Sequence, residues 1–270
     1  MNAGVADGSA RRLILAALLS GFVATVAAAQ KRPRDPNEVQ PERPTVATHA
    51  YTVAPGWVEI EAGLEIDRYP GGVPGMVAPV VVKIGLGRRL QLDLFGAVQN
   101  PPDGGTTGIG DLAVGLKWRV LYDAPLLGNV SLQPSLKLPT APTASGLGTG
   151  TTDVALLLIS SHDLGPVSMD LNVGYTRRSG NGALAPRGAT LWTASFGGPV
   201  AGDLGWTAEL YGYPGTAGPA GQAPIVALLA GPTLQLRTWL AVDTGIIVPI
   251  RGPQPRALYF GGVTNVGRLW

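Results

Sequence analysis

The stretch GTTGIGDLAVGLKWRV, residues 105–120, has the glycine content of a nucleotide-binding loop. Glycines spaced in this way let a backbone wrap closely around phosphate groups. That chemistry needs a strand before the glycines and a helix after them, whose N-terminus binds the pyrophosphate. Here a loop rich in proline and glycine precedes the glycines, and the alternating segment DLAVGLKWRV follows them. The order favours a loop that leads into a strand over a nucleotide site.

A second stretch, SSHDLGP, contains the residue types of a hydrolase: Ser160, Ser161, His162 and Asp163. A catalytic nucleophile, its base and the group that orients the base come from distant segments, because adjacent residues cannot converge on one substrate atom. We therefore interpret His162 as a turn residue and expect no enzymatic activity. The only other histidine is His49, and the chain has no cysteine, so we expect neither a metal nor another cofactor.

The N-terminal residues predict export. Two arginines at 11 and 12, an apolar run and three alanines ending at position 29 form the pattern of a cleaved signal peptide over residues 1–29. Residues 30–52 are rich in proline and charge and have no apolar period, which predicts an extended periplasmic linker. The formal net charge of +2 implies no nucleic-acid partner.

Residues 53–270 alternate between apolar and polar side chains. In VEIEAGLEID, residues 58–67, every second residue is apolar, which is the period of a strand with one apolar and one polar face. The pattern returns in RLQLDLFGAV, DLAVGLKWRV and PVSMDLNVGYT, and more weakly in residues 224–236. The segments predict about twelve strands of roughly ten residues, with about ten or fourteen strands as alternatives.

Three further features favour a transmembrane antiparallel up-and-down β-barrel. Long and mostly shorter connections alternate along the chain, as on the two rims of outer-membrane barrels. With 45% hydrophobic and 14% charged residues, the chain has few charges for the surface of a soluble lipocalin-like protein, the less favoured alternative. Trp118, Trp206 and Trp270 would face outer-membrane lipid at the interface, and Trp270 would also serve the barrel assembly machinery as an insertion signal.

Since the aliphatic face of each strand would contact lipid, the charged side chains would face the lumen. These lumen candidates are Glu59, Glu61, Glu65, Lys83, Asp93, Asp111, Lys117, Arg119, Lys137, Asp153, Asp170, Glu209 and Asp243, with Arg89 and Arg237. Opposite charges across a narrow lumen would pair, so one hypothesis is a closed structural barrel. The other is an open channel, in which the acidic excess would favour cations.

A transporter of hydrophobic solutes would instead turn apolar side chains inward. The candidates for this role are Phe95, Tyr211, Ile225, Leu229 and Tyr259.

Several stretches together resemble a known family: residues 43–65, 108–120, 135–140 with 146–158, and 240–246. They are similar to the outer-membrane proteins identified as transporters of the phenol meta-degradation pathway. The likeness covers essentially the whole mature chain and departs at Ala141, where the family has glycine after LPT. It implies a porin-like barrel in the outer membrane of a Gram-negative cell and the transport of small solutes, with aromatic or hydrophobic compounds as candidates.

Overall fold

The structure is a computed structural model that describes residues 35–69, 72, 74–100, 106–181, 186–214 and 224–270. The signal peptide predicted over residues 1–29 lies outside the described residues. The chain divides into two compact units, Met1–Asp35 and Pro36–Trp270, and the second unit contains every strand described below.

Most of the second unit is β-strand. Its elements are β1 (Trp57–Arg68), β2 (Gly75–Gly87), β3 (Leu90–Asn100), β4 (Gly108–Ile109), β5 (Leu112–Ala124), β6 (Gly128–Leu138), the 3-10 turn η1 (Thr143–Ser145), β7 (Asp153–Leu164), β8 (Val167–Arg178), β9 (Gly188–Ala201), β10 (Leu204–Tyr213), β11 (Ile225–Arg237), β12 (Leu240–Arg251) and β13 (Arg256–Arg268).

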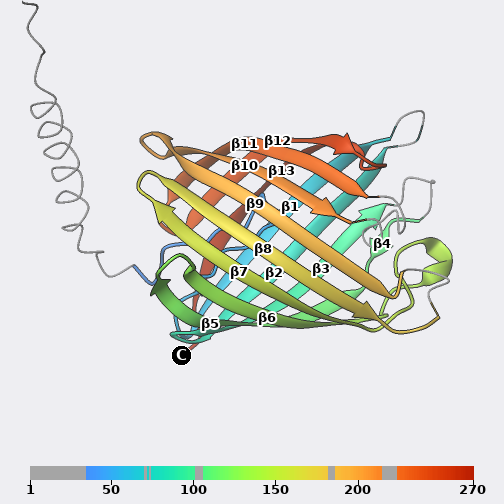
Figure 1. Cartoon of the computed structure of the whole chain (residues 1–270), viewed down its shortest axis with the longest axis horizontal. Helices are drawn as coiled ribbons and strands as arrows, with labels where there is room; N and C mark the ends of the chain where they lie inside the picture. The colour runs from blue at the N-terminus through green and yellow to red at the C-terminus, as the bar shows by residue number, and fades with distance from the viewer. Residues whose placement is uncertain (1–34, 70–71, 73, 101–105, 182–185, 215–223) are drawn as a thin grey trace, which may run out of the picture. The chain divides into compact units, whose positions relative to one another are not determined.

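The strands form a closed antiparallel barrel (Figure 1). Each long strand pairs with its neighbours in the chain, and β1 pairs with both β2 and β13, which closes the ring. The two-residue strand β4 pairs with the end of β3 beyond the part that pairs with β5, so the described residues form twelve long strands. Closure satisfies the backbone hydrogen bonds of the edge strands, which an open sheet would leave exposed. The predicted fold class and strand number are confirmed.

The two rims differ as the sequence predicted. The connections β2–β3, β5–β6, β7–β8, β9–β10 and β11–β12 contain only two or three residues, and we call their end of the barrel the short-turn rim. Gly165 and Gly202 lie in two of these turns with φ of 76° and 55°, values that glycine adopts without strain. The connections at the opposite end are longer, and we call that end the long-loop rim.

The wall has its apolar face outside. On β5, Leu112 and Trp118 are 46% and 51% exposed, whereas Lys117 between them is 0% exposed. A soluble β-protein buries its apolar face, so this wall suits apolar surroundings. Among the described residues, no helix has the length and apolar composition needed to cross a bilayer.

Residues 36–54 lie inside the barrel, and we call them the lumen segment. Near its start, the Val39 amide donates to the Thr238 carbonyl in the β11–β12 turn at 3.0 Å. Just after its end, the Gly56 amide donates to the Gly85 carbonyl of β2 at 2.7 Å, so both ends lie at the short-turn rim. The sequence predicted a periplasmic linker for residues 30–52. The structure differs for residues 36–52, because the polar lumen binds this extended backbone.

Candidate transport lumen

Side chains of the wall accept hydrogen bonds from the backbone of the lumen segment. Glu209 of β10 accepts from the Val46 and Ala47 amides, both at 2.7 Å. Glu59 and Glu61 of β1 accept from the amides of residues 40 and 42 at 2.6 and 2.8 Å. An extended segment without a sheet partner needs such acceptors, because buried amides that lack a partner are costly. The acidic lumen residues therefore hold this segment in place.

Uncharged wall residues complete the binding of the segment. Asn172 of β8 accepts from the Thr48 amide at 2.7 Å and donates to the Thr48 carbonyl at 2.9 Å. The Ala50 amide donates to Ser161 at 2.8 Å, and Ser131 donates to the Ala50 carbonyl at 2.7 Å. The Val53 amide donates to Gln91 at 2.7 Å. These bonds come from β3, β6, β7 and β8, and the acidic acceptors lie on β1 and β10, so the segment is fixed on several sides.

Two fully buried lysines neutralise the carboxylates at this level of the lumen. Lys83 forms ion pairs with Glu59 and, at 2.5 Å, with Glu61. Lys117 forms an ion pair with Glu42 of the lumen segment and donates to the Thr48 hydroxyl at 2.9 Å. Both lysines are 0% exposed, and buried charges are tolerated when they are paired and hydrogen-bonded.

Three other lumen candidates also have polar partners inside the barrel. Asp93 accepts hydrogen bonds from the side-chain amides of Gln91 and Gln133, both at 2.7 Å. Asp170 accepts from Ser161 at 2.5 Å. Arg119 donates to Asn129 and lies over the rings of residues 51 and 122, at 4.9 and 4.0 Å from their centroids. Glu65 lines the cavity described below.

A separate polar cluster lies at the long-loop rim. Lys137 donates to Asp111 at 2.7 Å, and Asp111 accepts further bonds from the amides of Ala141 and Thr149 at 3.1 and 3.0 Å. Asp111 precedes β5 and lies outside the strands. Burial acts to raise the pKa of Asp111, but the bonds from Lys137 and the two amides outweigh it and lower the pKa below its ordinary value. Asp153 forms ion pairs with Lys137 and Arg178 at 3.5 and 3.4 Å.

Two predicted lumen residues lie elsewhere. Arg89 is in the β2–β3 turn and is exposed, with its guanidinium 4.5 Å from the centre of the Tyr122 ring. Arg237 is exposed at the last position of β11, after a register shift that begins at Gln235. Side chains alternate strictly only within a regular strand, so the alternation does not hold in a turn or across a bulge.

The residues of SSHDLGP do not converge on one point. Ser160 and His162 are 2.8 Å apart and share one face of β7. Asp163 accepts from the Tyr51 hydroxyl at 3.2 Å, and Ser161 donates to Asp170 inside the lumen. Within the described ranges, no group of three or more His, Cys, Asp or Glu residues could hold a metal ion.

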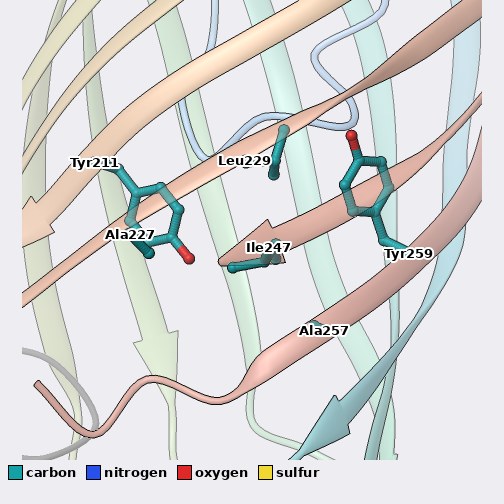
Figure 2. Close-up of a cluster of buried hydrophobic side chains, with 6 residues drawn as sticks. All are labelled: Tyr211, Ala227, Leu229, Ile247, Ala257 and Tyr259. Carbon is teal, nitrogen blue, oxygen red and sulfur yellow. The ribbon is translucent and has the colours of Figure 1, made fainter. Parts of the chain in front are cut away.

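Apolar side chains occupy the inner wall nearer the long-loop rim. Figure 2 shows Tyr211 of β10, Leu229 of β11, Ile247 of β12 and Tyr259 of β13 on one side of the lumen. They are buried together with Ala227 and Ala257, and Val46 of the lumen segment packs against them. Tyr211, Leu229 and Tyr259 are three of the residues expected for a hydrophobic-solute transporter, and a fourth, Ile225, is also buried.

A cavity of about 900 Å³ opens beside this cluster, and we call it the loop-side cavity. Its apolar lining includes Phe95, Tyr211, Tyr213, Leu229 and Ile247. The lumen segment lines it from residue 42 to residue 48. Pro186 and Gln254 also line it, so the cavity reaches the loops of the long-loop rim.

A second cavity of about 410 Å³, the turn-side cavity, reaches Gly202 and Asp203 in the β9–β10 turn. Pro41 and Arg43 of the lumen segment line it together with Asp243 of β12. The lumen segment thus lines both cavities.

Sequence reasoning missed the uncharged residues that bind the lumen segment, and it missed Glu42 and Arg43 within that segment. Gln91, Ser161 and Asn172 share the inward face of their strands with charged residues, which is a signal that could have found them. The excess of acidic over basic lumen candidates was a second signal, because the surplus carboxylates need donors.

The fold is similar to that of solved outer-membrane proteins. The crystal structure of the COG4313 outer membrane channel from Pseudomonas putida F1 matches with a TM-score of 0.62 and 13% identity, over 84% of this chain and 100% of that chain. The NanC porin matches with a TM-score of 0.49 and 10% identity, over 77% of this chain and 98% of that chain. No family model and no curated protein matches the chain. The likeness to the COG4313 channel therefore shows that this chain has the β-barrel fold of that protein.

Proposed function

We propose that the protein is an outer-membrane channel that transports small solutes with an aromatic or hydrophobic body. The observation that carries this proposal is the loop-side cavity. Its volume of about 900 Å³ is in the range of about 300 to 1,000 Å³ typical of small-molecule sites. The tyrosine, phenylalanine, leucine and isoleucine side chains in its lining suit the apolar body of a solute, and charged residues such as Glu65 and Arg178 line the rest.

The outer-membrane location rests on the surface of the barrel and on its rims. The exposed aliphatic and aromatic residues suit lipid, and outer-membrane barrels have short periplasmic turns and longer external loops. The loop-side cavity would then face the exterior of the cell. The barrel fold shared with an outer membrane channel and the sequence likeness to phenol-pathway transporters support the same proposal.

The proposal also covers export and assembly. We propose that residues 1–29 are a signal peptide that is cleaved on export, and that the barrel assembly machinery recognises Trp270 during insertion. We also propose that the protein transports solutes and does not catalyse a reaction. Cleavage is tested by N-terminal sequencing of protein from outer-membrane fractions, where we expect the first residue to be Gln30.

A structural barrel without transport is the second candidate, because the lumen segment fills much of the polar lumen. This candidate predicts no conductance in planar bilayers and no binding of an apolar probe.

The direct test is isothermal titration calorimetry of the detergent-purified protein with toluene. We expect Leu229→Ala to weaken binding by about tenfold, because it removes apolar contact area from the cavity. Leu228→Ala is the matched control, since Leu228 is the preceding residue on β11 and is 41% exposed on the outer face. Equal affinity in wild type and both variants would show only partition into detergent and would contradict the proposal.

A further inference from the structure

We propose that the side chain of Arg43, held by Asp243, is the partition between the two cavities and determines which solutes pass through the lumen. This inference rests on the proposed function in one respect, namely that solutes cross the membrane through the lumen.

Arg43 occupies the boundary of the two cavities. Of the residues that the structure describes, it is the one that lines both of them. The loop-side cavity reaches Gln254 near the long-loop rim, and the turn-side cavity reaches Asp203 at the short-turn rim. A path from rim to rim through these cavities therefore passes the Arg43 side chain.

An ion pair with Asp243 and a hydrogen bond to the wall hold this side chain. Nε and Nη2 of Arg43 donate to the two carboxylate oxygens of Asp243 at 3.4 and 3.3 Å, and Nη2 also donates to the Phe260 carbonyl at 3.4 Å. All three distances are longer than about 2.7 to 2.9 Å, the usual N···O distance of a hydrogen bond between charged groups. The Arg43 side chain is 14% exposed, so it is in contact with open space in the lumen. These contacts are weak enough to be exchanged.

Two glycines of the wall lie against the Arg43 guanidinium. Gly63 of β1 and Gly261 of β13 are paired across the two strands. A Cβ added at Gly261 would lie 2.6 Å from Nε of Arg43, and one at Gly63 would overlap the guanidinium. The guanidinium therefore fills a slot that two glycines leave in the wall. When the side chain leaves the slot, that volume becomes open.

The backbone beside Arg43 is anchored independently of its side chain. The Glu42 amide donates to Glu61 at 2.8 Å on one side, and the Val46 and Ala47 amides donate to Glu209 on the other. A rotamer change of Arg43 breaks none of these bonds. The partition can therefore move while the lumen segment stays bound.

The pair also controls the charge at the boundary. Arg43 and Asp243 offset each other's charge, so removal of either one changes the net charge at the boundary by one unit. A charge at a constriction attracts ions of the opposite sign. The two single variants should therefore shift ion selectivity in opposite directions, which a merely structural role would not do.

The test is single-channel conductance of the full-length barrel in planar bilayers in KCl, with reversal potentials in a KCl gradient. We expect Arg43→Ala to raise conductance on the order of twofold or more and to shift selectivity toward potassium. Asp243→Asn should shift selectivity toward chloride, and Arg43→Lys should show no shift toward potassium, because it keeps the positive charge.

Arg237→Ala is the matched control. Arg237 is an exposed arginine at the last position of β11, and it lines neither the loop-side cavity nor the turn-side cavity. Its removal should leave conductance at the wild-type level. Heat-dependent migration on gels confirms that each variant is a folded barrel.

Equal conductance of Arg43→Ala and Arg237→Ala, including no conductance in either, would overturn the partition. The result is separable from that of the proposed function, because salt currents do not depend on binding of an apolar solute. If toluene does not bind but the Arg43 variants change the current as expected, the partition stands and the solute class is wrong. If toluene binds and the currents do not change, the partition is wrong and the solute class stands.

Discussion

The half of the lumen near the short-turn rim and the half near the long-loop rim are formed by the same strands but differ in the side chains that they turn inward. In the first, which we call the polar half, carboxylates, amides and lysines bind the lumen segment. In the second, which we call the apolar half, tyrosines and aliphatic side chains of β10 to β13 line one side of the loop-side cavity, and charged residues such as Glu65 and Arg178 line it elsewhere. Polar side chains of the wall thus bind the backbone of the lumen segment, and the apolar cluster borders the larger of the two cavities.

The change occurs within single strands. On β10, Glu209 binds the lumen segment, and Tyr211 belongs to the apolar cluster only two residues away. On β12, Asp243 holds Arg43, and Ile247 lines the cavity. Two residues along a strand correspond to about 7 Å, so the boundary between the halves is narrow.

The largest effect is expected from Lys83→Met in the polar half. It would leave Glu59 and Glu61 buried without their counterion, and breaking a buried ion pair in this way costs about 3 to 5 kcal/mol. The free energy of unfolding in urea, measured in lipid vesicles, checks this value. Lys137→Met is the control, because Lys137 is 21% exposed and water can reach the carboxylates that it leaves, so its loss should cost less than that of Lys83. If both variants lowered the free energy of unfolding by the same amount, buried charges and charges at the rim would not differ in their contribution to stability.

Glu209→Ala should have the next largest effect. This variant removes the hydrogen-bond acceptor of two amides of the lumen segment. Each amide left without a partner should destabilise the bound segment by about 1 kcal/mol or more. Hydrogen exchange followed by mass spectrometry should show faster exchange at Val46 and Ala47, with the barrel strands unchanged. Glu209→Gln keeps one carbonyl acceptor and should fall between Glu209→Ala and wild type. Unchanged exchange in Glu209→Ala would show that the segment is held without this carboxylate.

In the apolar half, Leu229→Ala should lower stability by only about 1 to 2 kcal/mol. Leu229 already borders the loop-side cavity, so its truncation enlarges an existing space, whereas in a packed core the same change costs about 2 to 5 kcal/mol. Urea unfolding of the variant measures this cost. A loss as large as that of Lys83→Met would mean that the apolar half is packed as a core and is not a solute chamber.

The smallest effect concerns the cluster around Asp111 at the long-loop rim. Since the pKa of Asp111 is lowered in the folded protein, its stabilising contribution is present at neutral pH and is lost as the pH falls through that lowered pKa. Hydrogen exchange of residues 139–152 should therefore accelerate in acid. In Asp111→Asn the exchange should be fast already at neutral pH, after correction for the intrinsic rate. Identical pH profiles in both proteins would exclude Asp111 as the cause.

The alternation of residue types was enough to predict the strands, because lipid on one side and a polar lumen on the other impose opposite demands on successive residues. The weak segment at residues 224–236 still forms β11, since its neighbours β10 and β12 supply its hydrogen bonds. Arg89 and Arg237 show the limit of this reasoning, because a turn or a bulge ends the alternation.

The sequence by itself determined the barrel, its two rims and the inward direction of most charged residues, since each of these depends on local periodicity and on loop length. Only the tertiary structure decided that residues 36–54 turn into the lumen, because their amides bond to side chains more than a hundred residues away, such as Glu209 and Asn172. It also decided that Arg43 meets Asp243, with a separation of 200 residues. Closure of the barrel brings such partners together across the lumen. The local sequence pattern does not indicate which residues then face each other.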